Sequence, residues 1–263
     1  MSLLRTRGLT KEFGGVTAVD EVDFEIDHDE LCALIGPNGA GKTTFFNCLT
    51  GSLSPTRGTV EIADSGGWND VTDAGPDETA RAGIHRSYQI TNVFASSTVL
   101  ENVRIAAQAH GRGSLQAWRN VEAFPEHYEE ATAILERVGL ADSAERVAST
   151  LSHGEKRQLE MAIALAGDPD LLLLDEPAAG VSSESVDDVV ELIEEVSADH
   201  AILLVEHNMD LVMDVAERIV VLHRGRIIAD DEPMAVRNNE RVREAYLGGY
   251  GAEEPSGTEE VGA

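Results

Sequence analysis

The sequence predicts an α/β fold with a parallel-sheet core, an N-terminal antiparallel β layer and an inserted helical subdomain. Three observations predict it. A glycine-rich loop joins an apolar run to a helix-compatible segment within residues 31–49. Apolar runs alternate with helical segments over residues 171–222, which is the βαβ arrangement that makes strands parallel. Between residues 95 and 166, apolar residues recur with helical spacing instead.

The first part of the chain carries the predicted β layer. Residues 3–35 alternate short apolar runs with glycine-containing turns, which suits antiparallel strands that lead into a strand at Leu31–Ile35. A helix at Lys42–Leu49 follows the glycine-rich loop, and Thr59–Ile62 is another predicted strand. Gly, Asp, Asn and Pro dominate residues 64–77, so we expect a loop there.

The remaining elements alternate between strand and helix around the helical insert. The predicted strands are Ile84–Tyr88, Leu171–Leu174, Ile202–Val205 and Ile219–Leu222. The predicted helices are Val99–Ala109, Pro125–Val138, Glu155–Ala166, Glu184–Ser197 and Asn208–Ala216. We therefore expect an α/β core of residues 1–94 and 167–250, a helical subdomain of residues 95–166, and a disordered acidic tail of residues 251–263.

Composition excludes several classes of function. The 263 residues carry a formal net charge of -28, which repels nucleic acid and anionic lipid, so no nucleic-acid partner is expected. No apolar run approaches the roughly 20 residues of a membrane span, and no secretory leader pattern is seen. Cys32 and Cys48 are the only cysteines, and we expect free, buried thiols as in a cytosolic protein.

The acidic residues are scattered along the chain rather than clustered. We interpret this pattern as adaptation to high salt, where short screening lengths tolerate self-repulsion, and it indicates an origin in a halophilic archaeon. An ordinary acidic cytosolic protein is the alternative interpretation.

The glycine-rich run is the first chemical motif. Gly36-Pro37-Asn38-Gly39-Ala40-Gly41-Lys42-Thr43-Thr44 fits G-x-x-x-x-G-K-[ST], the loop that wraps nucleotide phosphates. Lys42 would reach the β- and γ-phosphates, and the Thr43 hydroxyl would ligate Mg²⁺. A ligand-free glycine-rich turn is the alternative, but the strand–loop–helix context favours phosphate binding.

Two carboxylates end the apolar run Leu171–Leu174. Functional groups gather at the carboxyl ends of buried parallel strands, so Asp175 would hold the Mg²⁺ shell and Glu176 would orient and deprotonate a water molecule. A core strand that ends in a solvated acidic turn is the alternative. Gln89 and His207 also follow predicted strands, although each is a weak signal alone.

The run Leu151-Ser152-His153-Gly154-Glu155 precedes a predicted helix. Ser152 suits the N-cap and Glu155 the capping-box position, which is a purely structural interpretation. The functional interpretation uses the same helix N-terminus as an anion site for the ATP of a partner subunit.

Taken in order, these motifs resemble the nucleotide-binding subunits of ABC transporters over about residues 3 to 247. The resemblance implies the ABC ATPase form of the P-loop NTPase fold. Phe13 lies where the family places an aromatic ring that stacks on adenine. The runs Phe46–Gly51, Asp175–Gly180, Glu206–Met213 and Glu244–Gly248 are similar to the branched-chain amino-acid importer branch, and urea and short-amide importers share much of this pattern.

The resemblance implies ATP and Mg²⁺ as ligands. Two subunits would close head to tail around two ATP molecules, each site joining one subunit's Gly36–Thr44 loop to the other's Ser152 and Gly154. The implied catalytic residues are Glu176, His207, Gln89 and Lys42. The implied Mg²⁺ ligands are Thr43, Gln89 and Asp175.

The family also implies partners and a location. Residues 90–94 would meet integral-membrane permease subunits, the second ATPase subunit would be a copy or a sister chain, and an extracytoplasmic solute-binding protein would act indirectly. The chain would lie on the cytoplasmic face of the membrane, held by the permease. An exporter, or a non-transport ABC ATPase such as an iron–sulfur assembly scaffold ATPase, is the alternative.

The chain departs from the general family signature at two places. His153 and Glu155 stand where Gly and Gln are usual. The segment Gly180-Val181-Ser182-Ser183 lacks the Asp that many members use across the dimer, so communication between the two sites is open.

Overall fold

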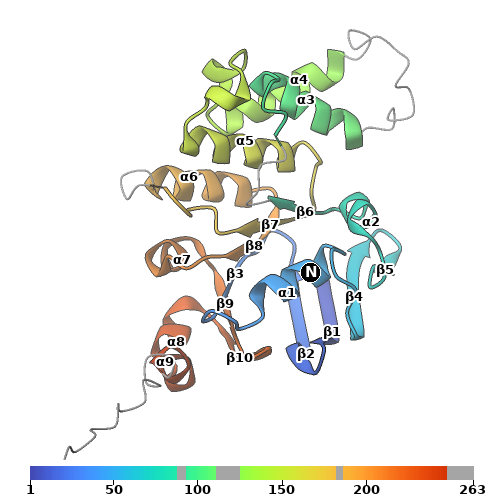
Figure 1. The fold of residues 1–263 in the computed structure, drawn as a ribbon, viewed down its shortest axis with the longest axis vertical. Helices are drawn as coiled ribbons and strands as arrows, with labels where there is room; N and C mark the ends of the chain where they lie inside the picture. Colours follow the sequence, from blue (N-terminus) through green and yellow to red (C-terminus); the bar gives the residue numbers. More distant parts are fainter. Residues whose placement is uncertain (88–92, 111–124, 182–185, 248–263) are drawn as a thin grey trace, which may run out of the picture.

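The computed structural model describes residues 1–87, 93–110, 125–181 and 186–247. Two β-sheets and the helices around them make up the described part (Figure 1). Gln89, most of the segment 90–94 and the acidic tail lie outside the described residues.

The larger sheet has six strands in the order β10-β9-β3-β8-β7-β6. Its strands are β3 (Leu31–Ile35), β6 (Ile84–Ser87), β7 (Leu171–Asp175), β8 (Ala201–Val205), β9 (Arg218–His223) and β10 (Arg226–Asp231). β3 pairs in parallel with β8 and β9, and β7 pairs in parallel with β6 and β8, whereas β10 is antiparallel to β9. The predicted parallel core is therefore confirmed.

The smaller sheet is antiparallel, in the order β2-β1-β4-β5. Its strands are β1 (Ser2–Phe13), β2 (Val16–Asp27), β4 (Arg57–Asp64) and β5 (Gly67–Asp70). Strand β5 and the start of α2 (Pro76–Arg81) correct the loop predicted for residues 64–77. β5 is an exposed edge strand whose Trp68 ring lies 3.9 Å beneath the Arg5 guanidinium, a contact between strands that local composition does not reveal.

The helices cover the parallel sheet on both faces. They are α1 (Lys42–Leu49), α3 (Val99–His110), α4 (Pro125–Arg137), α5 (His153–Leu165), α6 (Val186–Ser197), α7 (Met209–Val215), α8 (Pro233–Asn238) and α9 (Glu240–Leu247). In Figure 1, α3, α4 and α5 gather at one end of the molecule, and α8 and α9 lie at the other. The helices predicted within residues 95–166 are confirmed to within two residues, and the subdomain boundaries remain a prediction.

The strands β3, β7, β8 and β9 are buried on both faces, which explains their apolar runs. Alternate residues enter two hydrophobic clusters. Leu172 and Leu174 of β7 join the cluster that includes α5, and Leu171 and Leu173 join the cluster that includes Phe45 of α1 and the antiparallel sheet. The helices α5 and α1 therefore pack against opposite faces of the sheet.

The two cysteines are free and buried, as predicted. Burial raises the pKa of Cys32 to about 12 and that of Cys48 to about 11, so both thiols stay protonated at neutral pH. Among the described residues, no helix combines the length and the apolar character that a membrane crossing requires.

Candidate functional site

The phosphate loop connects β3 to α1, as predicted. Gly36 has φ 156°, and a Cβ there would lie 2.1 Å from the Leu222 carbonyl oxygen. Gly41 caps α1 with φ 107°, and a Cβ there would lie 2.2 Å from the Ala18 oxygen. Any side chain at these positions would push the loop away from β9 and β2, so both positions require glycine.

The start of α1 has the features that an anion site requires. Its first turn holds no acidic residue, and the Thr43 side chain is exposed there. Lys42 is buried, and its Nζ donates to the Gly36 carbonyl oxygen at 2.6 Å. Burial lowers the pKa of Lys42, while the nearby Glu176 and Asp175 charges act in the opposite direction. Free N–H groups, a lysine and a hydroxyl therefore converge where a phosphate can bind.

Glu176 and His207 meet beside this loop. Each follows a strand of the parallel sheet, Glu176 after β7 and His207 shortly after β8. The Glu176 amide donates to the Val205 carbonyl at 2.7 Å, and Glu176 Oε1 lies 2.9 Å from His207 Nε2. The Glu176 backbone has φ 51°, an uncommon conformation for a residue with a side chain. The turn therefore holds the carboxylate at the edge of the sheet and against the imidazole.

Glu206 organises this edge, and the sequence analysis missed it. Its side chain is buried, and Oε1 accepts the Ala178 amide at 2.8 Å. Oε2 accepts the amides of His207 and Asn208 at 2.8 and 3.2 Å. One carboxylate thus ties the turn after Glu176 to the segment that carries His207. The signal available in the sequence was a charged residue directly after an apolar strand.

Asp175 has a partner that the sequence analysis also missed. The Arg86 guanidinium, at the end of β6, donates to Asp175 Oδ2 and also to Asn47 Oδ1 at 2.6 Å. The two charged side chains are 10% and 12% exposed, so this ion pair is largely shielded from water. The predicted cation-binding carboxylate is therefore neutralised by an arginine.

Phe13 ends β1 on the hairpin beside the loop. It pairs with Val16 of β2, two residues before the Ala18 oxygen that approaches Gly41. Phe13 is 44% exposed, and Lys11 Nζ lies 5.2 Å from the centroid of its ring. An exposed aromatic ring next to the phosphate loop is available for stacking on a base.

Ser152 and Gly154 begin α5 and are exposed. Ser152 is the N-cap, and the predicted capping box is confirmed: Glu155 N donates to Ser152 Oγ at 3.3 Å, and Ser152 N to Glu155 Oε2 at 2.8 Å. The hydrogen bond from the Ser152 amide, helped by Arg146, lowers the Glu155 pKa from 4.5 to about 2. Helix α5, which Ser152 and Gly154 begin, packs against one face of the sheet. Helix α1, which follows the phosphate loop, packs against the other face.

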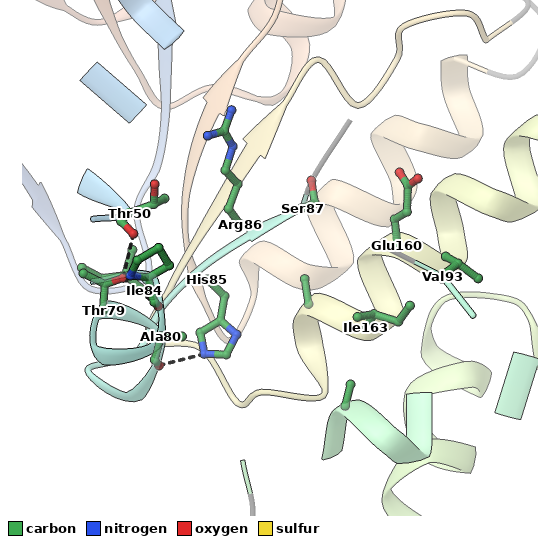
Figure 2. Close-up of a pocket in the computed structure, with 13 residues that line it drawn as sticks. Thr50, Thr79, Ala80, Ile84, His85, Arg86, Ser87, Val93, Glu160 and Ile163 are labelled. Atoms are coloured by element: carbon green, nitrogen blue, oxygen red, sulfur yellow. Dashed lines mark hydrogen bonds between the residues drawn. The ribbon is translucent and has the colours of Figure 1, made fainter. Parts of the chain in front are cut away.

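A cavity of about 230 Å³ lies between the core and helix α5 (Figure 2). Core residues Thr79, Ile84 and His85 line one side, and Glu160 and Ile163 of α5 line the other. The walls of the cavity are mainly apolar. His85 Nε2 bonds the Ala80 carbonyl oxygen at 3.0 Å, and burial raises the Glu160 pKa. In Figure 2 the His85 and Arg86 side chains leave β6 in opposite directions, and both residues line the cavity.

Known proteins resemble this chain over almost its whole length. A protein-family model described as ABC transporter matches residues 19–179, and one described as Branched-chain amino acid ATP-binding cassette transporter matches residues 226–252. The high-affinity branched-chain amino acid transport ATP-binding protein LivG of Escherichia coli (strain K12) is 40% identical, over 94% of this chain and 98% of that protein.

An archaeal relative and a crystal structure extend the similarity. The probable branched-chain amino acid transport ATP-binding protein LivG of Archaeoglobus fulgidus is 34% identical, over 96% of this chain and 98% of that protein. The ADP conformation of MJ1267, an ATP-binding cassette of an ABC transporter, superimposes with a TM-score of 0.80 at 30% identity. That match covers 94% of this chain and 99% of the other.

Replacing Glu206 by Gln should loosen the edge that holds Glu176 and His207. The amide retains one accepting oxygen, so it cannot accept on both sides, and we expect a loss of about 1–3 kcal/mol in the free energy of unfolding. ATP hydrolysis should fall with it, because His207 loses its fixed position. Urea unfolding and hydrolysis rates in molar KCl measure both effects. Glu217→Gln, at an exposed carboxylate, is the matched control, and equal behaviour of the two variants would contradict the assignment.

Proposed function

Because this chain belongs to the ABC transporter ATPases, as its match to the ABC transporter model and its 40% identity to LivG establish, we propose that it powers an importer of branched-chain amino acids. The observation that carries the proposal is the match of residues 226–252 to the branched-chain amino acid cassette model. Relatives named for the same substrates extend over nearly the whole chain and support it.

In the proposed mechanism, Glu176 is the general base. It would accept a proton from a water molecule while His207 contacts the γ-phosphate. The 2.9 Å approach of Glu176 Oε1 to His207 Nε2 supports this pairing, because both groups then border the same reacting centre. Lys42 and the amides at the start of α1 would hold the phosphates, and Phe13 would stack on the base.

Oxygen atoms at the site suit Mg²⁺. The Thr43 hydroxyl and the Asp175 carboxylate are hard oxygen donors, which Mg²⁺ prefers. Thr43 follows Lys42 in the chain and the Asp175 charge acts on Lys42, which supports a common site for phosphate and Mg²⁺. We propose that these two residues hold the ion, together with Gln89. When bound, Mg²⁺ neutralises charge that develops on the phosphate oxygens.

The proposed working form is a head-to-tail pair of subunits. Ser152 and Gly154 are exposed at the start of a 13-residue helix, where free N–H groups attract an anion. Helices α5 and α1 pack on opposite faces of the sheet, which supports an anion supplied by a second subunit. ATP phosphates between two acidic subunits would close the pair, and hydrolysis would open it.

The cavity between the core and α5 is the proposed docking site for a permease. It combines core residues with residues of the helical insert, so a segment bound there would sense their relative position. The chain would thus be held at the cytoplasmic face of the membrane through the permease, with a solute-binding protein acting on the other side.

Replacing Glu176 by Gln should slow ATP hydrolysis by about 10²–10⁴, the usual contribution of a general base, and leave ATP binding intact. Hydrolysis and light scattering of the purified protein in molar KCl measure both properties. ATP-dependent dimers should persist in the variant and dissociate in the wild type. Near-normal hydrolysis in the variant would remove Glu176 from the role of base.

Uptake by cells tests the proposed substrates. A strain whose only copy of this chain carries Glu176→Gln should lose ATP-driven uptake of labelled leucine, isoleucine and valine. Urea uptake should be unchanged and serves as the control. A loss confined to urea or short amides would instead assign the chain to that related group of importers.

We also propose that the carboxylate-rich surface is an adaptation to concentrated salt. With a net charge of -28, self-repulsion falls as the Debye length shortens, so the free energy of unfolding should rise between about 0.2 M and about 3 M KCl. Urea unfolding at fixed KCl concentrations measures it. Stability that is flat or falls over this range would favour an ordinary acidic protein.

A further inference from the structure

The Arg86 guanidinium joins three elements at the phosphate site. It comes from β6, donates to Asp175 at the end of β7, and donates to Asn47 of α1 at 2.6 Å. Its central carbon lies 5.6 Å from the Phe46 ring centroid, on the same helix. The carboxylate to which it is bound is the one that the proposed function assigns to Mg²⁺.

A shielded carboxylate needs a cationic partner. The Asp175 side chain is only 12% exposed, and an uncompensated charge there would be strongly destabilising. In this structure Arg86 supplies the compensation. Asp175 Oδ2 accepts the guanidinium N–H, so a divalent cation on this carboxylate would share it with Arg86. A guanidinium and Mg²⁺ on one carboxylate would also repel each other in a poorly solvated site.

Arg86 would keep other interaction partners after it releases Asp175. Asn47 Oδ1 would continue to accept its Nη1, and the Phe46 face lies within the range of a cation–π contact. The guanidinium would therefore keep a hydrogen-bond acceptor and an aromatic neighbour while the carboxylate turns to another cation. An exchange of partners then costs less than full exposure of a buried charge.

We propose that Arg86 is a positioning residue that holds Asp175 in the nucleotide-free protein and competes with Mg²⁺ for this carboxylate when Mg·ATP binds. The proposal rests on the proposed role of Asp175. Arg86 is followed on β6 by Ser87. Ser87 lines the cavity between the core and α5, and it also lines a second cavity together with Ser152 and Gly154.

The test measures the Mg²⁺ concentration at which a fluorescent ATP analogue is half-bound, together with the temperature of unfolding without nucleotide. Arg86→Gln should lower this Mg²⁺ midpoint about tenfold, because the group that competes with Mg²⁺ is removed. A tenfold change corresponds to the contribution of one hydrogen bond to a charged group. The nucleotide-free protein should unfold at a lower temperature, because Asp175 is left without its cation. Arg86→Lys keeps the charge but cannot reach both acceptors, and its midpoint should lie between those of wild type and Arg86→Gln.

Arg104→Gln is the matched control. Arg104 is buried, bonds Glu101 at 2.9 Å and lies 5.3 Å from the Tyr128 ring, far along the chain from the phosphate loop. Its loss should lower the unfolding temperature and leave the Mg²⁺ midpoint unchanged. A midpoint that is unchanged or raised in Arg86→Gln would overturn the competition.

Asp175→Asn separates this failure from failure of the proposed function. It should raise the Mg²⁺ midpoint, and adding Arg86→Gln in that background should have no further effect, because the contested carboxylate is absent. An unchanged midpoint in Asp175→Asn would show that Asp175 does not hold Mg²⁺, whatever Arg86 does. A raised midpoint in Asp175→Asn with no decrease in Arg86→Gln would overturn the competition alone.

Discussion

The parallel pairing of β3, β8 and β7 is the constraint on which the site depends. Leu34 pairs with Val205, and Val205 pairs with Asp175, so three strands end at the same level. Because these strands are buried on both faces, the polar side chains of the site lie at or just beyond their carboxyl ends, with Asp175 as the last residue of β7. The phosphate loop, Glu176 and His207 are therefore brought to one edge by backbone hydrogen bonds between apolar segments. The apolar strands of the sheet thus position the reactive side chains, most of which follow the strands in the chain.

Much of this edge could be predicted because its signals are contiguous in sequence. Gly36–Thr44 carries its own strand, turn and helix start, and the four leucines before Asp175 identify a buried strand and its end. The capping box of Ser152 and Glu155 is equally local, and the structure has it. Strand β5 could not be predicted in this way. Its residues resemble a loop, and it is a strand because β4 pairs with it and Trp68 packs under Arg5.

The residues that the sequence analysis missed share a different property: their partners lie on other elements. Glu206 bonds the turn after β7 from the end of β8, and Arg86 bonds α1 and β7 from the end of β6. Glu206 follows an apolar run and Arg86 lies in a short, mostly polar strand, and neither pattern indicates more than a position near an edge of the sheet. Which N–H groups or carboxylate each residue meets depends on strand order, and strand order is a long-range outcome of packing. The role of such a residue is visible only once the sheet is assembled.

Charge compensation explains why β6 connects the site to the rest of the molecule. Asp175 and Glu176 place two carboxylates beside a loop that must receive further negative charge from phosphates, so the cations there control binding. Lys42 is anchored to its own loop through the Gly36 carbonyl, whereas Arg86 reaches the site from a different strand. Arg86 lies on the four-residue strand β6 between His85 and Ser87, which line the cavity that faces α5. The same short strand therefore borders both the Asp175 carboxylate and the proposed docking cavity, and for this reason we propose β6 as the element that connects them.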